Sequence, residues 1–337
     1  MKIRKSTKVF GLAILALLAS ACANLIEPPS GYTIQYHDGA NWMENLPDDW
    51  HLSRITIPGT HDSGADRATV HLPWYAPKGQ ILTQDYHIVD QLRLGVRWFD
   101  IRLRYVGDED LPLHHGDWYL HKNFTDVLRW TIGFLEDHPT EIVVLMIKQE
   151  KSHVDSDTFS RAVYHHLLKF DSKYFYLKYR VPTVGEARGQ IFIVRRFPRH
   201  DRDVDFGIYV NWENNTKGDW YVPKNQNYKF YVQDHWSLNT VPYDEKVEEV
   251  IKCIKKAHNS HDVTTFYLNY ASGWKGYESV RSTAEGINYD VEDFLEDHHW
   301  WHCGVIMLNF AGTVAPDLVR EIYCRNPNRT ETGDVCE

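Results

Sequence analysis

EIVVLMIK (141–148) is apolar at six successive positions and ends on a lysine. A strand with one face in water alternates apolar and polar residues, whereas a strand in a parallel sheet covered by helices is apolar throughout. The Ile and Val side chains of this stretch also favour a strand. The stretch therefore predicts a central strand of a parallel sheet whose two faces are both buried.

Six further runs of this kind occur along the chain. They are RITIPG (54–59), VRWFDIRLR (96–104), QIFIVRR (190–196), YKFYVQD (228–234), TTFYLNY (264–270) and GVIMLNF (304–310). Helical patterns separate several of them, at 124–138, 157–170 and 243–258. An eighth strand is expected near LPLHHG (111–116). Strands alternating with helices in this number predict an α/β fold, a single TIM-type β/α barrel. The alternative is an open doubly wound sheet, but no glycine-rich phosphate loop follows the first strand.

Functional side chains of a β/α barrel gather at the carboxyl ends of its strands. Six polar residues are expected there: His61, Arg102, Lys148, Arg196, Asp234 and Asn309. In ITIPGTHDSGA (55–65) we expect Pro58-Gly59 to end the first strand and to deliver His61 and Asp62 to this edge. His114 and His115 point to opposite faces if they lie on a strand, so only one of them can face the site.

These residue types point to phosphodiester chemistry. Two histidines can act as general base and general acid near neutral pH. An arginine offers a planar charge that binds phosphate through two hydrogen bonds. No cysteine or histidine cluster has the spacing of a zinc site. The inventory predicts a phosphodiesterase that uses acid–base catalysis without a metal.

The first 21 residues combine a basic start, an apolar stretch and a small-residue cleavage site, Ala19-Ser20-Ala21. This pattern predicts a secretory signal peptide, and the apolar stretch is shorter than the ~20 residues of a membrane span. Cys22, directly after the cleavage site, offers the alternative of a lipid anchor at the cell surface. We expect a secreted protein.

Four cysteines follow Cys22: Cys253, Cys303, Cys324 and Cys336. An even number in an exported protein suggests disulfides, with three possible pairings. The formal net charge of the chain is −9, and removal of the signal would take away four more cations. So acidic a protein is poorly suited to bind nucleic acid or to be held electrostatically on anionic membranes.

Several blocks resemble the catalytic X domain of phosphatidylinositol-specific phospholipase C in its secreted bacterial form. They are RITIPGTHDSGA, QLRLGVRWFDIRLR, LPLHHG, EIVVLMIKQE, GEARGQIFIVRRF, YVQDHW, YDEKV, FYLNYAS and GVIMLNF. The resemblance spans about residues 42–325, which leaves a lead segment at 22–41 and a tail at 326–337. It implies a distorted β/α barrel, in agreement with the strand pattern.

The resemblance also implies roles for individual residues. His61 would be the general base that activates the inositol 2-hydroxyl, and His115 the general acid that protonates the diacylglycerol oxygen. Asp62 would orient His115, and Arg102 would bind the phosphate. Lys148, Arg196 and Asp234 would bind the inositol hydroxyls. Trp236 stands where the family has a tyrosine platform under the inositol ring.

Two positions qualify this resemblance. Asn309 replaces the aspartate that supports the base histidine in secreted bacterial members. The resemblance therefore implies that another carboxylate supplies the missing charge, or else that the enzyme is slow or has a different optimum. Arg102 places a cation where the calcium-dependent branch holds its ion, so the resemblance implies metal independence and no cofactor.

Two other functions compete with this one. The first is a weakened X domain that binds inositol phosphate head groups without turnover, and the second is a metal-dependent glycerophosphodiesterase on a similar barrel. The expected partners are phosphatidylinositol or glycosylated inositol lipids, bound by a monomer in peripheral contact with a membrane. Trp74-Tyr75, in the loop after His61, are candidates for that contact.

Overall fold

A computed structural model describes residues 39–199, 206–224, 226–276, 278–298 and 302–326. These residues belong to one compact unit, 35–337. The predicted signal peptide, most of the lead segment, Cys22, Cys336 and nearly all of the tail lie outside the described residues. Within the described residues, no helix is both long enough and apolar enough to cross a membrane.

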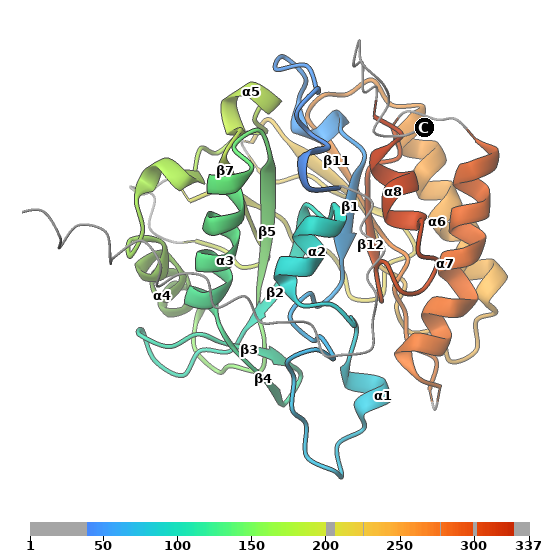
Figure 1. The fold of residues 1–337 in the computed structure, drawn as a ribbon, viewed down its shortest axis with the longest axis horizontal. Helices are drawn as coiled ribbons and strands as arrows, with labels where there is room; N and C mark the ends of the chain where they lie inside the picture. The colour runs from blue at the N-terminus through green and yellow to red at the C-terminus, as the bar shows by residue number, and fades with distance from the viewer. Residues whose placement is uncertain (1–38, 200–205, 225, 277, 299–301, 327–337) are drawn as a thin grey trace, which may run out of the picture. The chain divides into compact units, whose positions relative to one another are not determined.

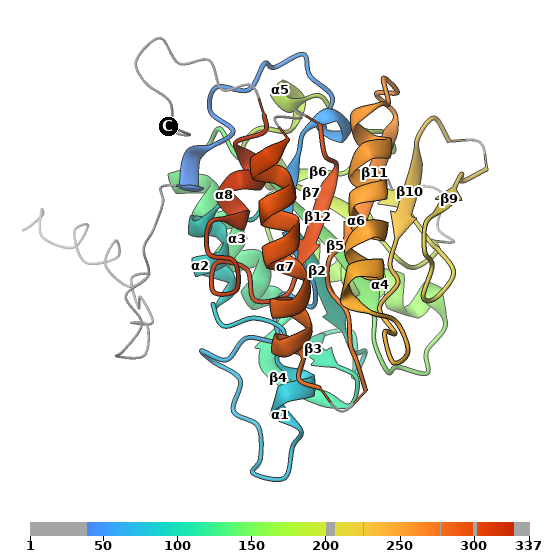
Figure 2. The same cartoon turned by 90° about the vertical axis from the view of Figure 1, so that its right-hand side faces the viewer.

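Seven parallel strands curl around a common interior (Figures 1 and 2). Their bounds are β1 (Ile57–Thr60), β2 (Trp98–Leu103), β5 (Ile142–Gln149), β7 (Gln190–Arg195), β10 (Lys229–Gln233), β11 (Thr265–Tyr270) and β12 (Val305–Leu308). They pair in the order β7-β5-β2-β1-β12-β11-β10. Each coincides with one of the seven predicted runs, which confirms the predicted TIM-type barrel.

The barrel is distorted on one side. The two-residue strands β6 (Phe175–Tyr176) and β8 (Ile208–Tyr209) both pair with the outer edge of β7. On the opposite edge, β9 (Asp219–Tyr221) runs antiparallel to β10. Within the described residues, no strand pairing joins these two edges, so the sheet does not close by hydrogen bonds.

The prediction of an eighth barrel strand at LPLHHG is wrong. Strand β3 (Pro112–His115) forms an antiparallel hairpin with β4 (Trp118–Asn123), and it meets β2 in antiparallel orientation. A parallel neighbour of β2 would need a crossover of a dozen residues, and only eight separate β2 from β3. Gly116, with a φ of 58°, instead makes the tight hairpin turn.

Helices cover the outside of the sheet (Figure 2). The α-helices are α1 (Lys78–Ile81), α2 (Ile88–Leu94), α3 (Phe124–Asp137), α4 (Ser156–Leu167), α5 (Val184–Ala187), α6 (Tyr243–His258), α7 (Val280–Asp297) and α8 (Leu318–Tyr323). Short 3₁₀ turns lie at Gly39–Asn41, Leu52–Arg54 and Ser172–Tyr174. The three helices predicted from periodicity are present as α3, α4 and α6. Helix α7 was not predicted from the sequence. Its buried residues include Ile287 and Asn288.

Aromatic side chains fill the amino end of the barrel. The Trp98 and Phe266 rings lie 5.5 Å apart although β2 and β11 are not neighbours, and Phe230 stacks on Phe266 at 5.3 Å. Side chains two residues apart on a strand share a face. Asp100 and Arg102 therefore point into the same interior as Trp98, above this apolar floor, at the carboxyl ends of the strands.

Pro58 and Gly59 do not end the first strand as predicted, because β1 continues through them to Thr60. Pro58 has no N–H to donate towards β2. None is needed, because β2 begins only at Trp98. The N–H of the residue before it, Arg97, donates to the Pro58 carbonyl. Gly59 is required because a Cβ there would lie 2.4 Å from the Met307 sulfur. The pair lets β1 pack tightly between β2 and β12.

The predicted pairing of all four later cysteines is also wrong. Cys253 and Cys303 are buried thiols. Cys253, on α6, packs against Tyr231 and Tyr267. Burial raises the pKa of both thiols to about 12, which keeps them protonated.

Candidate active site

His61 stands directly after β1, where backbone bonds hold it in place. Its N–H donates to the Leu308 carbonyl at 2.9 Å, and its own carbonyl accepts from Gln84 at 3.0 Å. The next residue, Asp62, has a φ of 41°, a left-handed conformation that aspartate tolerates better than most residues. This turn lets the neighbours His61 and Asp62 both face the barrel mouth.

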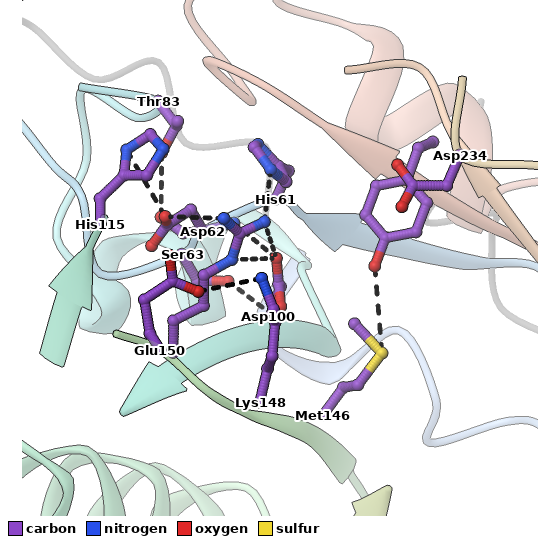
Figure 3. Close-up of polar contacts among 12 residues, drawn as sticks. His61, Asp62, Ser63, Thr83, Asp100, His115, Met146, Lys148, Glu150 and Asp234 are labelled. Carbon is purple, nitrogen blue, oxygen red and sulfur yellow. Dashed lines mark hydrogen bonds and ion pairs between the residues drawn. The ribbon is translucent and has the colours of Figure 1, made fainter. Parts of the chain in front are cut away.

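Arg102 contacts His61, Asp62 and Asp100, whose side chains lie together in Figure 3. Its Nη2 lies 2.7 Å from His61 Nε2, and its Nη1 lies 3.4 Å from Asp62 Oδ2. Asp100 Oδ2 accepts from Nε and Nη2 of the same guanidinium at 3.1 and 3.0 Å. Although burial acts to lower it, Asp100 and Asp62 hold the pKa of Arg102 well above its ordinary value. The guanidinium is therefore a permanent, oriented cation.

His61 is set up as a neutral base. Because an arginine N–H can only donate, Nε2 of His61 must be the unprotonated nitrogen. Nδ1 then carries the proton and donates to the Asn309 side-chain oxygen at 2.9 Å. Burial first, and then the charge of Arg102, lower the pKa of His61 to about 3. The predicted partnership of His61 with Asn309 is present in the structure.

His115 comes from the β3–β4 hairpin and faces His61 edge-on, with ring centroids 6.4 Å apart. Its Nδ1 donates to the Ile81 carbonyl at 2.6 Å and lies 3.5 Å from Asp62 Oδ2. Nε2 is thus left facing the mouth. His114 lies on the other face of the hairpin and packs on Tyr119, so only one histidine of the pair faces the site.

Asp62 is the acidic group between His115 and Arg102. Burial raises the pKa of Asp62 to about 6, while the two cationic neighbours act in the opposite direction. The carboxyl therefore changes its charge within the physiological range, next to the histidine that it contacts.

A second polar cluster lies beside the first. Lys148 pairs with Arg102 in the register of β5 and β2, and its Nζ contacts Glu150 at 2.9 Å. Glu150 also accepts from the Gly116 N–H at 3.1 Å, which ties this cluster to the turn after His115. Burial and the charge of Arg102 lower the pKa of Lys148.

The far wall carries the remaining predicted binding residues. The Arg196 guanidinium lies 3.4 Å above the Trp212 ring, and Trp212 donates to Asp234 at 2.9 Å. Burial raises the pKa of Asp234, and Arg196 opposes that shift. Trp236 contacts Trp274, with ring centroids 6.5 Å apart, and donates to Asn214, so it lies at the rim and not in the central cluster.

Sequence reasoning missed four residues of this site: Asp100, Glu150, Trp212 and Tyr270. Asp100 stands two residues before Arg102, and Glu150 stands two residues after Lys148. The period of two along a strand was the signal that could have found them. The Tyr270 ring packs edge-on to His61 at 6.1 Å and forms part of the floor.

Within the described residues, no group of three or more histidine, cysteine, aspartate or glutamate side chains is arranged to hold a metal ion. Asp62 and Asp100 are paired with Arg102, and Glu150 is paired with Lys148.

Fold and site together define a β/α-barrel protein with two histidines around a buried arginine–carboxylate centre. The chain is 29% identical over 305 residues to a 1-phosphatidylinositol phosphodiesterase of Staphylococcus aureus, covering 85% of this chain and 94% of the relative. A Listeria monocytogenes protein of the same name is 25% identical over 264 residues, covering 75% of this chain and 74% of its own.

Solved structures agree with this relationship. A phosphatidylinositol-specific phospholipase C from Staphylococcus aureus superposes with a TM-score of 0.76 at 27% identity, covering 87% of this chain and 99% of its own. The Listeria monocytogenes enzyme shares the fold, with a TM-score of 0.71. No family model matches the chain. The chain is thus similar in sequence and fold to the bacterial phosphatidylinositol-specific phospholipases C, as its sequence blocks predicted.

Proposed function

We propose that this protein is a phosphatidylinositol-specific phospholipase C, with residues 42–325 as its catalytic domain. The observation that carries the proposal is the pair His61 and His115, whose ring centroids lie 6.4 Å apart. Arg102 contacts His61 directly, and it also contacts Asp62, the acidic neighbour of His115. In each histidine a protein oxygen lies beside Nδ1, so Nε2 is the nitrogen that would exchange a proton with the substrate. This arrangement suits a base and an acid acting on opposite sides of one phosphate.

In the proposed reaction, the phosphate draws Arg102 towards itself and so frees Nε2 of His61. That nitrogen takes the proton of the inositol 2-hydroxyl, and the oxygen attacks the phosphorus. The bond from phosphorus to the diacylglycerol oxygen breaks, and His115 gives that oxygen its Nε2 proton. The products are diacylglycerol and inositol 1,2-cyclic phosphate. Arg102 stabilises the charge on the phosphate oxygens in the transition state.

The second cluster and the far wall would hold the inositol ring. Lys148 can donate to ring hydroxyls, Asp234 can accept from them, and Arg196 is held flat by Trp212. Trp236 stays a proposed platform at the rim. Lys148 and Arg196 are cationic and Asp234 is an acidic group, so the set suits a neutral polyol better than a second phosphate.

Purified mature protein with phosphatidylinositol vesicles and EDTA, followed by ³¹P NMR, tests the function. A cyclic phosphodiester product in EDTA is the expected result. Activity abolished by EDTA would instead indicate a metal-dependent glycerophosphodiesterase and overturn metal independence. Head-group binding without turnover would indicate the weakened X domain, which is the second candidate because Asn309 gives His61 a neutral partner.

We also propose that Trp74 and Tyr75 attach the enzyme to the membrane. They are 92% and 66% exposed. They stand shortly before α1, which lies at the same end of the barrel as the β3–β4 hairpin (Figure 2). Tyr75 packs against Trp118 of that hairpin, with ring centroids 6.3 Å apart. The chain is acidic, so apolar contact is the available means of attachment. The Staphylococcus aureus phosphatidylinositol-specific phospholipase C binds membranes, and that binding can be modulated.

The double variant Trp74→Ala, Tyr75→Ala is expected to bind phosphatidylinositol vesicles about tenfold more weakly or worse, because two aromatic side chains lose their apolar burial. Vesicle sedimentation measures this. Trp220→Ala, an exposed aromatic on β9, is the matched control and should bind normally. Full binding by the double variant would contradict the proposed attachment.

The acidic limb of the rate profile is expected to come from Asp62. Because the pKa of Asp62 is raised to about 6, it holds a proton below that pH and is charged above it. Only the charged form stabilises protonated His115, so kcat/KM should fall as the pH drops through about 6. In Asp62→Asn the rate should be low at all pH values and this limb should disappear. An unchanged limb in the variant would assign it to another group.

Secretion by a signal peptide at 1–21, a lipid anchor at Cys22, disulfide bonding and a monomeric state all remain proposals. A secreted enzyme would meet phosphatidylinositol or glycosylated inositol lipids on the outer face of a membrane.

A further inference from the structure

His61 has an unusual electrical environment for a general base. Its Nδ1 partner is the neutral amide of Asn309, and the Nδ2 of that amide is buried without a hydrogen-bond partner in the described part of the chain. Arg102, its Nε2 neighbour, is a cation. When His61 takes a proton in the proposed reaction, neither direct neighbour offers a negative charge.

Asp100 is the anion behind this arrangement. Its side chain is fully buried on β2, and Oδ2 accepts from Arg102 and from the Asp62 N–H at 3.1 Å. Its other oxygen, Oδ1, is buried and has no hydrogen-bond partner among the described residues. A buried carboxylate with one unused oxygen retains strong influence over nearby charges.

The remaining groups that face His61 do not supply this charge. Asp62 is engaged with His115 and Arg102, and His115 is itself cationic when it acts as the acid. Tyr270 packs on His61 through its ring edge, and burial raises the pKa of its hydroxyl well above the ordinary value. The charge of Asp100 acts on His61 through Arg102, whose Nη2 contacts both side chains.

We propose that Asp100 is the positioning residue that supplies negative charge to protonated His61, the role that a neutral Asn309 cannot perform. This inference rests on the proposed function. As the substrate phosphate draws Arg102 away, the positive charge of Arg102 moves away from Asp100. The Asp100 carboxylate then stabilises the imidazolium that forms on His61. The base is then supported from the strand β2, on its Nε2 side, and not from residue 309.

The charge can be moved experimentally from one side of His61 to the other. Asp100→Asn keeps an oxygen for Arg102 but removes the charge, and kcat/KM should fall on the order of 10²-fold. Adding Asn309→Asp to that variant should recover at least about tenfold, because a carboxylate then faces Nδ1 directly. NMR titration of His61 should show a lower pKa in Asp100→Asn and a higher pKa in the double variant.

Glu150→Gln is the matched control, because Glu150 is a second carboxylate near Arg102 that pairs with Lys148 and not with His61. Asn309→Asp should not rescue Glu150→Gln. No recovery in the Asp100→Asn double variant, or equal recovery with Glu150→Gln, would overturn the inference.

Asp100→Glu guards against a purely structural effect, because it keeps the charge and changes the shape. It should lose less than Asp100→Asn, and an equal or larger loss would show that shape matters and not charge. Wild-type protein without phosphodiesterase activity would defeat the proposed function instead. The titration of His61 would still test Asp100 in that case.

Discussion

Replacing His61 with alanine is expected to lower kcat by about 10⁴-fold or more, because no other group can take the inositol hydroxyl proton. His61 Nε2 is the one unprotonated ring nitrogen placed beside Arg102, and a pKa of about 3 keeps it neutral throughout the working range. His115→Ala should be similarly slow on phosphatidylinositol. Release of inositol cyclic phosphate, followed by ³¹P NMR, measures both.

The two histidine variants should differ on another substrate. An inositol phosphodiester with a nitrophenolate leaving group needs no proton, so His115→Ala should recover most of its rate on it while His61→Ala should not. His114→Gln is the matched control, since His114 is the neighbour that faces away from the site. Equal recovery by both variants would reverse or remove the assigned acid and base roles.

Arg102→Lys should lower kcat/KM by about 10³-fold, although the charge is kept. The guanidinium contacts His61, Asp62 and Asp100 through three different nitrogens, and a lysine has only one. The ammonium can therefore satisfy one partner at a time and cannot hold a phosphate through two parallel hydrogen bonds. Steady-state kinetics on short-chain phosphatidylinositol measures the loss.

A surface substitution separates this effect from a general loss of stability. Arg93→Lys on α2 changes a partly exposed ion pair with Asp90 and should leave kinetics and thermal unfolding unchanged. A loss below tenfold in Arg102→Lys would mean that a point charge suffices at this position.

Much of the barrel could be read from the sequence, for a simple physical reason. A strand covered on both faces is nearly continuous in apolar residues, so EIVVLMIK and the six similar runs can be recognised in the sequence. The polar residue at the end of each run also marks the mouth of the barrel. His61, Arg102 and Lys148 are identified in this way from the sequence alone.

Other features depend on partners that a linear pattern does not show. LPLHHG reads as one more strand, and only the short connection from β2 turns it into a hairpin. Pro58 looks like a strand end until β2 is seen to begin too late to need its N–H. Cys303 appears available for a disulfide until it is found buried beside Thr56, to whose hydroxyl its N–H donates.

The sequence by itself determined that His61, Arg102 and Lys148 reach the barrel mouth, because strand periodicity and strand ends are local properties. Only the tertiary structure decided their electrical state. His61 and Asn309 are 248 positions apart, and they meet because β1 pairs with β12. Burial then lowers the pKa of His61, raises that of Asp62 and leaves Asp100 as the buried anion behind Arg102. Desolvation and the distances between charges depend on the folded interior, so they cannot be read from any single stretch of sequence.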